Sequence, residues 1–147
     1  MENILINKMT NEDLEKIKDN LSKEFDDFWD YEILKEELNS RTSKYIVAKK
    51  SNNIIVGFAG IKIILDEAEI MNIVTKKEER HQGIGKLLLN EIIKISKENN
   101  IYLINLEVNA KNTIAINLYK KYNFKEVGLR KKYYNGQDDA ILMTLKI

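Results

Sequence analysis

Residues 80–86, Arg-His-Gln-Gly-Ile-Gly-Lys, form the segment whose residue types and spacing point most directly to ligand binding. They lie between a predicted strand and the most strongly amphipathic predicted helix. Backbone N–H groups at a helix start lack intrahelical acceptors and carry the positive end of the helix dipole, so they bind phosphate oxygens. Gly83 and Gly85 would let a pyrophosphate approach the backbone closely. The alternative is an ordinary loop in which the glycines only permit a tight turn.

Two common nucleotide-binding motifs are excluded at this segment. The Walker pattern G-x-x-x-x-G-K-[ST] is absent. A dinucleotide-binding fingerprint needs a third glycine and an acidic residue after a following parallel strand, whereas residues 80–86 offer one Gly-x-Gly pair alone. The chemistry of this loop therefore has to be judged from its surroundings.

The composition of the 147-residue chain excludes several kinds of catalyst. It contains no cysteine and one histidine, His81, so a thiolate nucleophile, a zinc ribbon and a paired-histidine metal site are ruled out. The net charge of +1 supplies no general attraction for nucleic acid. The longest apolar run, residues 54–61, is far shorter than the roughly 20 residues of a membrane span. We therefore expect one cytoplasmic domain over residues 1–147, without metal, nucleic-acid or membrane partners.

Hydrophobic periodicity predicts an α+β fold with helices packed on a mixed, mostly antiparallel sheet. The predicted strands lie near residues 4–6, 45–48, 54–65, 68–74, 101–108, 124–129 and 140–145. The predicted helices lie near residues 10–21, 31–38, 84–98 and 113–122. A turn is predicted at residues 66–67 and a hairpin tip at residues 133–136.

Two of these helices carry further signals. Thr10, with Asp13 three residues later, resembles a capping box that would start the first helix. The helix after Gly83 is predicted to bury an apolar face made of Ile84, Leu87, Leu88, Ile92 and Ile95. Its N-terminus is the one that residues 80–86 would present to a phosphate.

In this setting, the pattern Arg-x-x-Gly-x-Gly at residues 80–85 resembles the acyl-CoA-binding motif of the GCN5-related N-acetyltransferase (GNAT) superfamily. Residues 112–119, Asn-Thr-Ile-Ala-Ile-Asn-Leu-Tyr, and residues 122–124 resemble its N-x-x-A-x-x-L-Y…G-F signature. Asn123 stands where glycine is usual in that family, and asparagine tolerates a left-handed turn. The predicted order of elements is similar to the GNAT fold along the whole chain. Within the superfamily, the second half most resembles the bacterial ribosomal-protein-alanine N-acetyltransferases.

The resemblance implies acetyl-CoA as cosubstrate and a protein N-terminal α-amine as acceptor, with the N-terminal alanine of a small-subunit ribosomal protein as the expected target. It implies a pyrophosphate cradle of His81, Gln82, Gly83, Ile84, Gly85 and Lys86, strand-edge groups of Ile73, Val74 and Thr75 for the pantetheine and acetyl carbonyl, Asn112 on the pantetheine arm, Glu107 as general base and Tyr119 as general acid. It implies no metal. Acetylation of lysine or a small-molecule amine is the nearest alternative, and a non-catalytic CoA-binding regulatory module is another. We expect a monomer or a weak dimer.

The residue types and their positions are compatible with the two catalytic roles. Strand alternation puts Leu103, Asn105 and Glu107 on one face, which becomes polar where the strand ends. Tyr119 lies one helical turn after Ala115, beside the apolar face. A carboxylate can take a proton from an attacking amine, and a phenol can protonate a leaving thiolate. The alternatives are a solvated strand-end glutamate and a core tyrosine whose hydroxyl reaches the rim.

Candidate acceptor-binding residues fall into three groups. They are the carboxylates Asp66, Glu67 and Glu69, the aromatics Trp29, Tyr31 and Tyr134, and the basic residues 130–132, Arg-Lys-Lys. The carboxylates could attract an α-ammonium, the aromatics could wall a peptide cleft, and the basic cluster could meet ribosomal RNA or an acidic peptide. The alternatives are exposed hairpin carboxylates, core aromatics and a solvated charged face. His81 could likewise be a loop donor near phosphate or a solvated side chain.

Overall fold

The structure, a computed structural model, describes residues 3–25, 30–134 and 136–147. Its strands are β1 (Ile4–Lys8), β2 (Ser43–Lys50), β3 (Ile55–Ile64), β4 (Glu67–Thr75), β5 (Leu103–Asn109), β6 (Lys125–Tyr134) and β7 (Asp138–Lys146). Its α-helices are α1 (Asn11–Ile17), α2 (Leu21–Glu24), α3 (Tyr31–Leu38), α4 (Ile84–Glu98) and α5 (Thr113–Lys121), with 3₁₀ segments at Lys18–Asn20 and Lys77–Glu79. Trp29, named above as an acceptor candidate, and Asn135 of the predicted hairpin tip lie outside the described residues.

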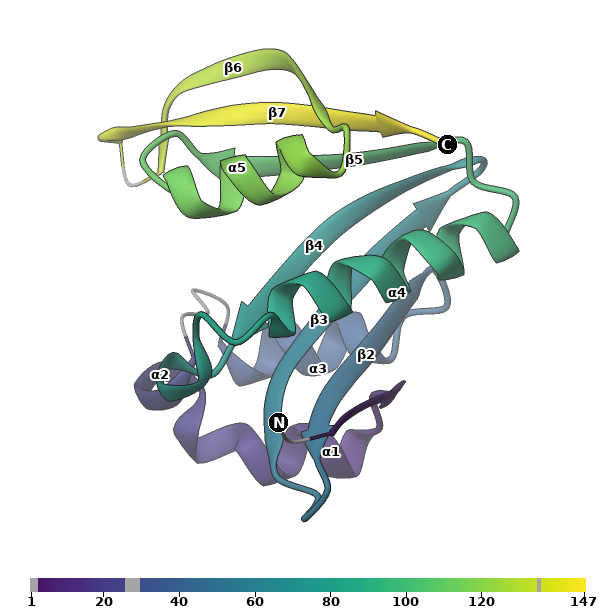
Figure 1. Cartoon of the computed structure of the whole chain (residues 1–147), viewed down its shortest axis with the longest axis vertical. Coiled ribbons are helices and arrows are strands. Elements are labelled where there is room, and N and C mark those ends of the chain that lie inside the picture. Colours follow the sequence, from purple (N-terminus) through teal and green to yellow (C-terminus); the bar gives the residue numbers. More distant parts are fainter. Residues whose placement is uncertain (1–2, 26–29, 135) are drawn as a thin grey trace.

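The strands of the described residues form one seven-stranded sheet in the order β1-β2-β3-β4-β5-β7-β6. β4 and β5 run parallel, and every other neighbouring pair runs antiparallel. Figure 1 shows α4 across one face of β2–β4, α1 and α3 on the other face, and α5 beside β5 and β7. The predicted mixed, mostly antiparallel sheet with flanking helices is therefore confirmed.

The parallel contact between β4 and β5 is short. It comprises three residue pairs, the last of which joins Glu69 to Asn105. Beyond that pair the two strands diverge, and Figure 1 shows the sheet separating into a β1–β4 part and a β5–β7 part. From residue 70 to residue 75, the edge of β4 that faces β5 therefore has no strand partner in the described part of the chain.

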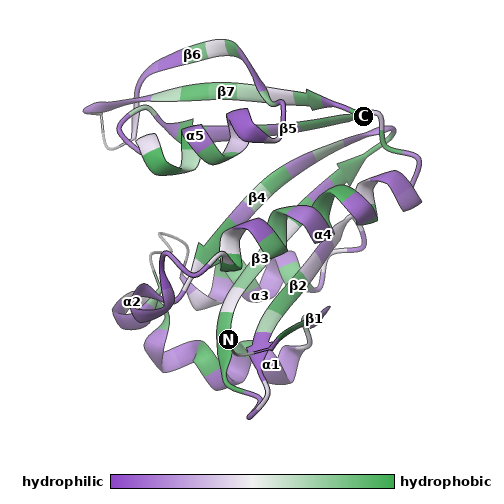
Figure 2. Cartoon of the chain, in the orientation of Figure 1, coloured by the Kyte–Doolittle hydropathy of each residue, from purple (hydrophilic) through white to green (hydrophobic). Residues whose placement is uncertain are grey.

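Apolar side chains pack on both faces of the sheet, in two clusters. The larger cluster joins the strands to α4 and α5, with Leu88 and Phe124 among its buried members. The smaller cluster joins β2 and β3 to α1 and α3, with Leu14 and Leu34 among its members. Figure 2 shows hydrophobic residues concentrated along the central strands, while the N-terminal helices are largely hydrophilic.

The buried face of α4 differs from the predicted one at a single leucine. Leu87 is 40% exposed, so its assignment to the apolar face was wrong, and Leu89 is buried instead. The predicted members that are buried or partly buried are Ile84, Leu88, Ile92 and Ile95. The buried i, i+4 row continues to Ser96. Because a helix turns by roughly 100° per residue, this row drifts around the helix toward Leu89 and away from Leu87.

Two turns also differ from the predicted positions. Ile64 pairs with Glu67, so the β3–β4 turn consists of residues 65–66 and lies one residue earlier than predicted. Leu65 in this turn is 93% exposed and has a φ of +57°. Tyr133 and Tyr134 of the predicted hairpin tip belong instead to β6, because Tyr134 still pairs with Asp138.

The predicted capping box at the start of α1 is confirmed. The Asp13 N–H donates to Thr10 Oγ1 at 3.1 Å, and the Thr10 N–H donates to Asp13 Oδ2 at 2.9 Å. Asp13 is buried, and Lys49 Nζ lies 2.8 Å from its Oδ1. Burial opposes ionisation of this carboxyl, but the hydrogen bonds from Lys49 and Thr10 outweigh it and lower the pKa of Asp13.

We expect Asp13→Asn to lower the free energy of unfolding at neutral pH by about 1–3 kcal/mol, since it removes a charged acceptor from a buried pair. A carboxyl whose pKa is lower in the folded state stabilises the fold above its unfolded pKa and loses that contribution as the pH falls through the folded value. The deficit should therefore shrink below about pH 4. Urea unfolding across this range measures it, with the exposed Glu12→Gln as control. A deficit independent of pH would contradict the prediction.

Candidate active site

A cavity of about 320 Å³ lies where β4 and β5 diverge, and we call it the β4–β5 cavity. Its walls come from β4, β5, the start of α5 and the end of β6. The lining residues are Ile70, Met71, Asn72, Ile73, Val74, Leu106, Glu107, Val108, Asn109, Asn112, Ala115, Tyr119 and Tyr134. The structure thus brings together five predicted site residues, namely Ile73, Val74, Glu107, Asn112 and Tyr119. Thr75 and residues 81–86 do not line this cavity.

An irregularity in β4 shapes one wall of the cavity. The pairing of β3 with β4 shifts after Gly60, so that Met71 is an extra residue in the ladder. A Cβ on Gly60 would lie 2.2 Å from the ring of Tyr45, which therefore occupies the space above this glycine. The Tyr45 hydroxyl donates to Asn72 Oδ1 at 2.7 Å. This buried hydrogen bond fixes Asn72, a cavity residue that the sequence showed only as a polar position inside an apolar strand.

Glu107 lies on the sheet face opposite α4 and α5. Its neighbours Leu106 and Val108 are buried against those helices, and strand alternation turns Glu107 to the other face, as predicted. The Glu107 side chain is 22% exposed, and its Oε1 lies 3.3 Å from Nη2 of Arg130. The carboxylate is therefore available both to the cavity and to a molecule arriving from solvent.

Tyr119 enters the cavity from α5, on the helix side of the sheet. Its ring packs against Phe124 with the ring centroids 5.6 Å apart. Burial, with a smaller contribution from the charge of Tyr134, raises the pKa of Tyr119 to about 12. The phenol is consequently protonated at neutral pH and can donate a proton there. Tyr119 is a core side chain and also part of the cavity wall, and its role as general acid stays a prediction.

Asn112 has a structural task that its predicted role did not include. It is the N-cap of α5, and its Oδ1 accepts a hydrogen bond from the Ala115 N–H at 3.1 Å. The Nδ2 amide group is then the part of the side chain left to bind a ligand. Asn112 can therefore present a hydrogen-bond donor to the β4–β5 cavity.

The start of α4 has the geometry expected of an anion-binding helix end. Gly83, its N-cap, has a φ of +82° and makes no side-chain capping bond. The Leu87 N–H bonds to the Gly83 carbonyl, so the N–H groups of residues 84–86 have no acceptor within the helix. His81 is exposed and also left-handed, with a φ of +67°.

A close approach between α4 and β3 places this helix start beside the cavity. A Cβ on Gly57 would lie 2.9 Å from the Val74 carbonyl oxygen and 3.0 Å from Ile84 Cγ2. Only glycine at this position lets the first turn of α4 rest against the end of β4. The uncapped helix start and the β4 wall of the cavity are therefore held next to each other.

The acceptor candidates among the aromatic and basic residues divide between the site and the surface. Tyr134 lines the β4–β5 cavity. Tyr31 does not, and its hydroxyl instead donates to Glu15 Oε2 at 2.6 Å. Within the basic cluster, Arg130 contacts Glu107, whereas Lys131 and Lys132 are exposed. The cluster is thus not one uniform basic face.

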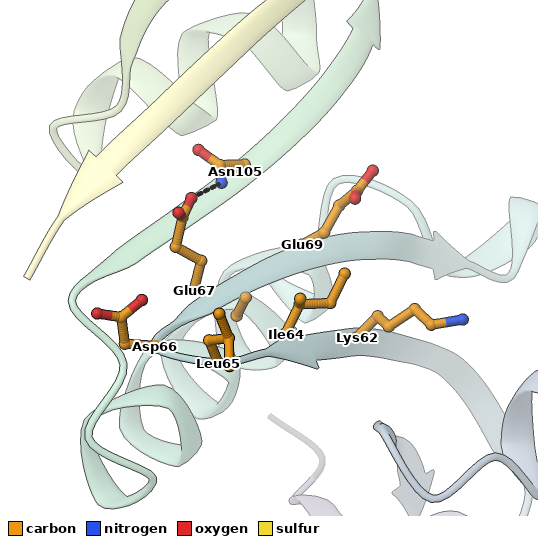
Figure 3. A pocket seen from close by; sticks show the side chains of 8 residues that line it. Lys62, Ile64, Leu65, Asp66, Glu67, Glu69 and Asn105 are labelled. Carbon is orange, nitrogen blue, oxygen red and sulfur yellow. Dashed lines mark hydrogen bonds between the residues drawn. The ribbon is translucent and has the colours of Figure 1, made fainter.

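A second cavity, of about 280 Å³, adjoins the short β4–β5 contact (Figure 3). Asp66, Glu67 and Glu69 line it, and Glu67 Oε1 accepts a hydrogen bond from Asn105 Nδ2 at 2.9 Å. Asn105 precedes Glu107 by two residues on β5, so the two share a sheet face. The carboxylates of the β3–β4 hairpin therefore lie beside the sheet face that carries Glu107.

Across residues 3–25, 30–134 and 136–147, no three His, Cys, Asp or Glu side chains are placed to hold a metal ion. In the same part of the chain, no helix has the length and apolar character needed to cross a membrane.

A sheet that opens between two parallel strands, with an uncapped helix start beside the opening, is the architecture of a GNAT acyltransferase. The sequence profile of the Acetyltransferase (GNAT) family matches residues 10–124, and the chain belongs to this family. It is an N-acetyltransferase of the GNAT kind, and enzymes of this kind use acetyl-CoA.

Several proteins are similar to this chain in sequence. The ribosomal protein bS18-alanine N-acetyltransferase of Haemophilus influenzae is 37% identical over 121 residues, which cover 79% of this chain and 80% of that protein. The Escherichia coli K12 enzyme of the same name is 36% identical over 99 residues, or 65% of this chain and 67% of that protein.

Solved structures of other proteins have a similar fold. The crystal structure of the ribosomal-protein-S18-alanine N-acetyltransferase from Escherichia coli has a TM-score of 0.90 at 26% identity, and the match covers 99% of this chain and 94% of that one. Arabidopsis thaliana NAA60 in complex with acetyl-CoA has a TM-score of 0.84 at 24% identity, covering 99% of each chain, and shares the fold.

Proposed function

We propose that this enzyme acetylates the N-terminal α-amine of a protein, and specifically the N-terminal alanine of a small-subunit ribosomal protein. The observation that carries the proposal is the meeting of Glu107 and Tyr119 at one cavity, beside the unpaired edge of β4. The cavity supports acetyl transfer to an amine. The identity of the acceptor is supported by the relatives at 36–37% identity, which are named for the alanine of ribosomal protein bS18.

In this proposal acetyl-CoA lies along the end of β4 and the start of α4. Its pyrophosphate meets the cradle of residues 81–86, in which the N–H groups of residues 84–86 have no acceptor within the helix and open space at Gly83 leaves the backbone accessible. The strand-edge groups for the pantetheine and the acetyl carbonyl come from Ile73, Val74 and Thr75. Asn112 donates to the pantetheine through Nδ2, because its Oδ1 caps α5.

Each catalytic residue has one proton to move. Glu107 accepts a proton from the acceptor ammonium, directly or through a water, and the neutral nitrogen then attacks the thioester carbonyl. The C–N bond forms, the C–S bond breaks, and Tyr119 donates its proton to the departing sulfur. The nitrogen loses its second proton to solvent, from which Tyr119 is protonated again. Glu107 then releases its proton to solvent, so the products are the acetylated amine, the CoA thiol and one released proton.

An α-amine is a better match to a carboxylate base than a lysine is. Its pKa in model peptides is about 7.7–8.0, against about 10.4 for lysine, and each pKa unit corresponds to about 1.4 kcal/mol. Removal of the proton from a lysine would therefore cost roughly 3.5 kcal/mol more. The carboxylates Glu67 and Glu69 beside the active-site face favour a second candidate, a polycationic small-molecule amine.

Product analysis by mass spectrometry distinguishes these acceptors. The purified chain is incubated with acetyl-CoA and one of three acceptors: an alanine-starting peptide, the same peptide with a blocked N-terminus and an internal lysine, or spermidine. We expect the acetyl group on the α-amine of the first peptide only. Transfer to lysine or spermidine without α-amine transfer would refute the proposal. CoA binding without transfer to any amine would indicate the regulatory module.

We expect Glu107→Gln to lower kcat for the alanine-starting peptide by about 10²–10⁴-fold, the usual contribution of a general base. CoA affinity, measured by calorimetry, should be unchanged because glutamine keeps the shape of the side chain. Glu126→Gln, a half-exposed carboxylate on β6, is the control. Unaltered turnover in the Glu107 variant would exclude this residue as the base.

We expect Gly83→Ala to weaken CoA binding about tenfold. Alanine in a left-handed conformation is strained by about 1–2 kcal/mol, and about 1.4 kcal/mol is a factor of ten in affinity. No atom lies within 4 Å of the added Cβ, so strain and not a clash is the cause. Gly136→Ala is a matched control, since Gly136 has a φ of +66° and equally open surroundings in the β6–β7 turn. Equal weakening by both variants would contradict the prediction.

A further inference from the structure

Arg130 reaches the proposed base from two strands away. It lies on β6, Glu107 lies on β5, and β7 runs between these strands. Arg130 pairs with Ala140 of β7, and Glu107 pairs with Leu142 of the same strand. Because Ala140 carries only a methyl group, a long side chain can cross β7 above it. The Arg130 guanidinium meets the Glu107 carboxylate at the end of this path, with Nη2 3.3 Å from Oε1.

β6 is irregular after Arg130. The pairing with β7 shifts between Arg130 and Tyr134, and Lys132 within this stretch has a φ of +54°. The Lys132 N–H donates to Asp139 Oδ1 at 2.9 Å, which fixes the irregular segment to β7. The neighbouring cations of the basic cluster therefore do not share the position of Arg130 over the sheet face.

The Arg130 guanidinium also contacts an aromatic ring. Its central carbon lies 5.3 Å from the ring centroid of Tyr133. Tyr133 in turn packs edge-to-face against Tyr134, with ring centroids 5.1 Å apart. Tyr134 lines the β4–β5 cavity and lies close enough for the Glu107 charge to contribute to its raised pKa, after burial. Arg130 is thus connected to the cavity both through Glu107 and through this tyrosine pair.

We propose that Arg130 is a positioning residue for Glu107 in acetyl transfer, an inference that rests on the proposed function of Glu107 as base. A glutamate side chain has several rotatable bonds, and an unrestrained carboxylate would sample many positions at the open face. The Arg130 guanidinium, whose Nη2 lies 3.3 Å from Oε1, restrains the carboxylate and leaves Oε2 to receive the proton of the acceptor ammonium. The Arg130 side chain is 54% exposed, and exposed ion pairs contribute little to folding stability. The effect of Arg130 therefore belongs in turnover and not in stability.

A double-mutant cycle separates this role from a direct contact with substrate. The variants are Arg130→Ala, Glu107→Gln and the combination of both, with kcat measured on the alanine-starting peptide at saturating acetyl-CoA. In the parent, Arg130→Ala should lower kcat about 10-fold, because displacement of a reacting group by an ångström has a large effect on rate. In the Glu107→Gln background the same change should alter kcat by less than about twofold. Arg130→Lys, which keeps the charge without the fork, should recover part of the loss.

Control measurements test whether the effect is specific to the Arg130–Glu107 pair. Lys125→Ala removes an exposed cation from the same strand, at a position with no proposed role in the site, and should leave kcat unchanged. CoA affinity and the thermal midpoint should be the same in Arg130→Ala and in the parent, which excludes a folding defect. An equal loss in both Glu107 backgrounds, or no loss in either, would overturn the positioning role while leaving the proposed function intact. Full turnover in Glu107→Gln alone would instead refute the base, and the role of Arg130 with it.

Discussion

The three-residue contact between β4 and β5 is the constraint on which the site depends. Had the ladder continued past Glu69, the backbone groups of β4 would bond to β5 and could not meet a ligand. The two strands are parallel, so their carboxyl ends point the same way, and the helix that follows each strand begins near the opening. The two helix starts, at Gly83 and Asn112, consequently flank one cavity although they are far apart in the sequence.

In the proposed mechanism, the opening also lets one reaction use both faces of the sheet. Glu107 projects from the face that is open to an arriving acceptor, whereas Tyr119 belongs to the helix-covered face and is nearly buried. Under the proposed mechanism, a chain without cysteine and with one histidine would thereby have a proton acceptor and a proton donor in contrasting surroundings. Burial raises the pKa of the Tyr119 phenol to about 12, while the Glu107 carboxylate is in contact with solvent and with the Arg130 guanidinium.

Local patterns predicted the elements and the residues that are set by neighbours in the chain. The capping box at Thr10 and the face of Glu107 follow from helix-start chemistry and strand alternation, and both are confirmed. The burial of Leu89 in place of Leu87 required the direction in which α4 crosses the sheet. The contact between Arg130 and Glu107 required the order β5-β7-β6 and an irregular β6, neither of which a linear pattern contains. The cradle at residues 81–86 stays a prediction from resemblance, because it lies outside the cavity lining.

The unpaired edge of β4 has a consequence for the association of one chain with another. Unpaired strand edges invite pairing with strands of other molecules and are common sites of aggregation. Here the free edge lies inside the sheet, between two of its own strands, and not at either margin. The outer margin at β6 carries exposed lysines, including Lys125 and Lys131, and two register shifts, both of which discourage edge-to-edge pairing. The strand edge that is open to a small ligand is thus enclosed within the sheet. The margin at β6, which is exposed to other chains, carries features that discourage strand pairing.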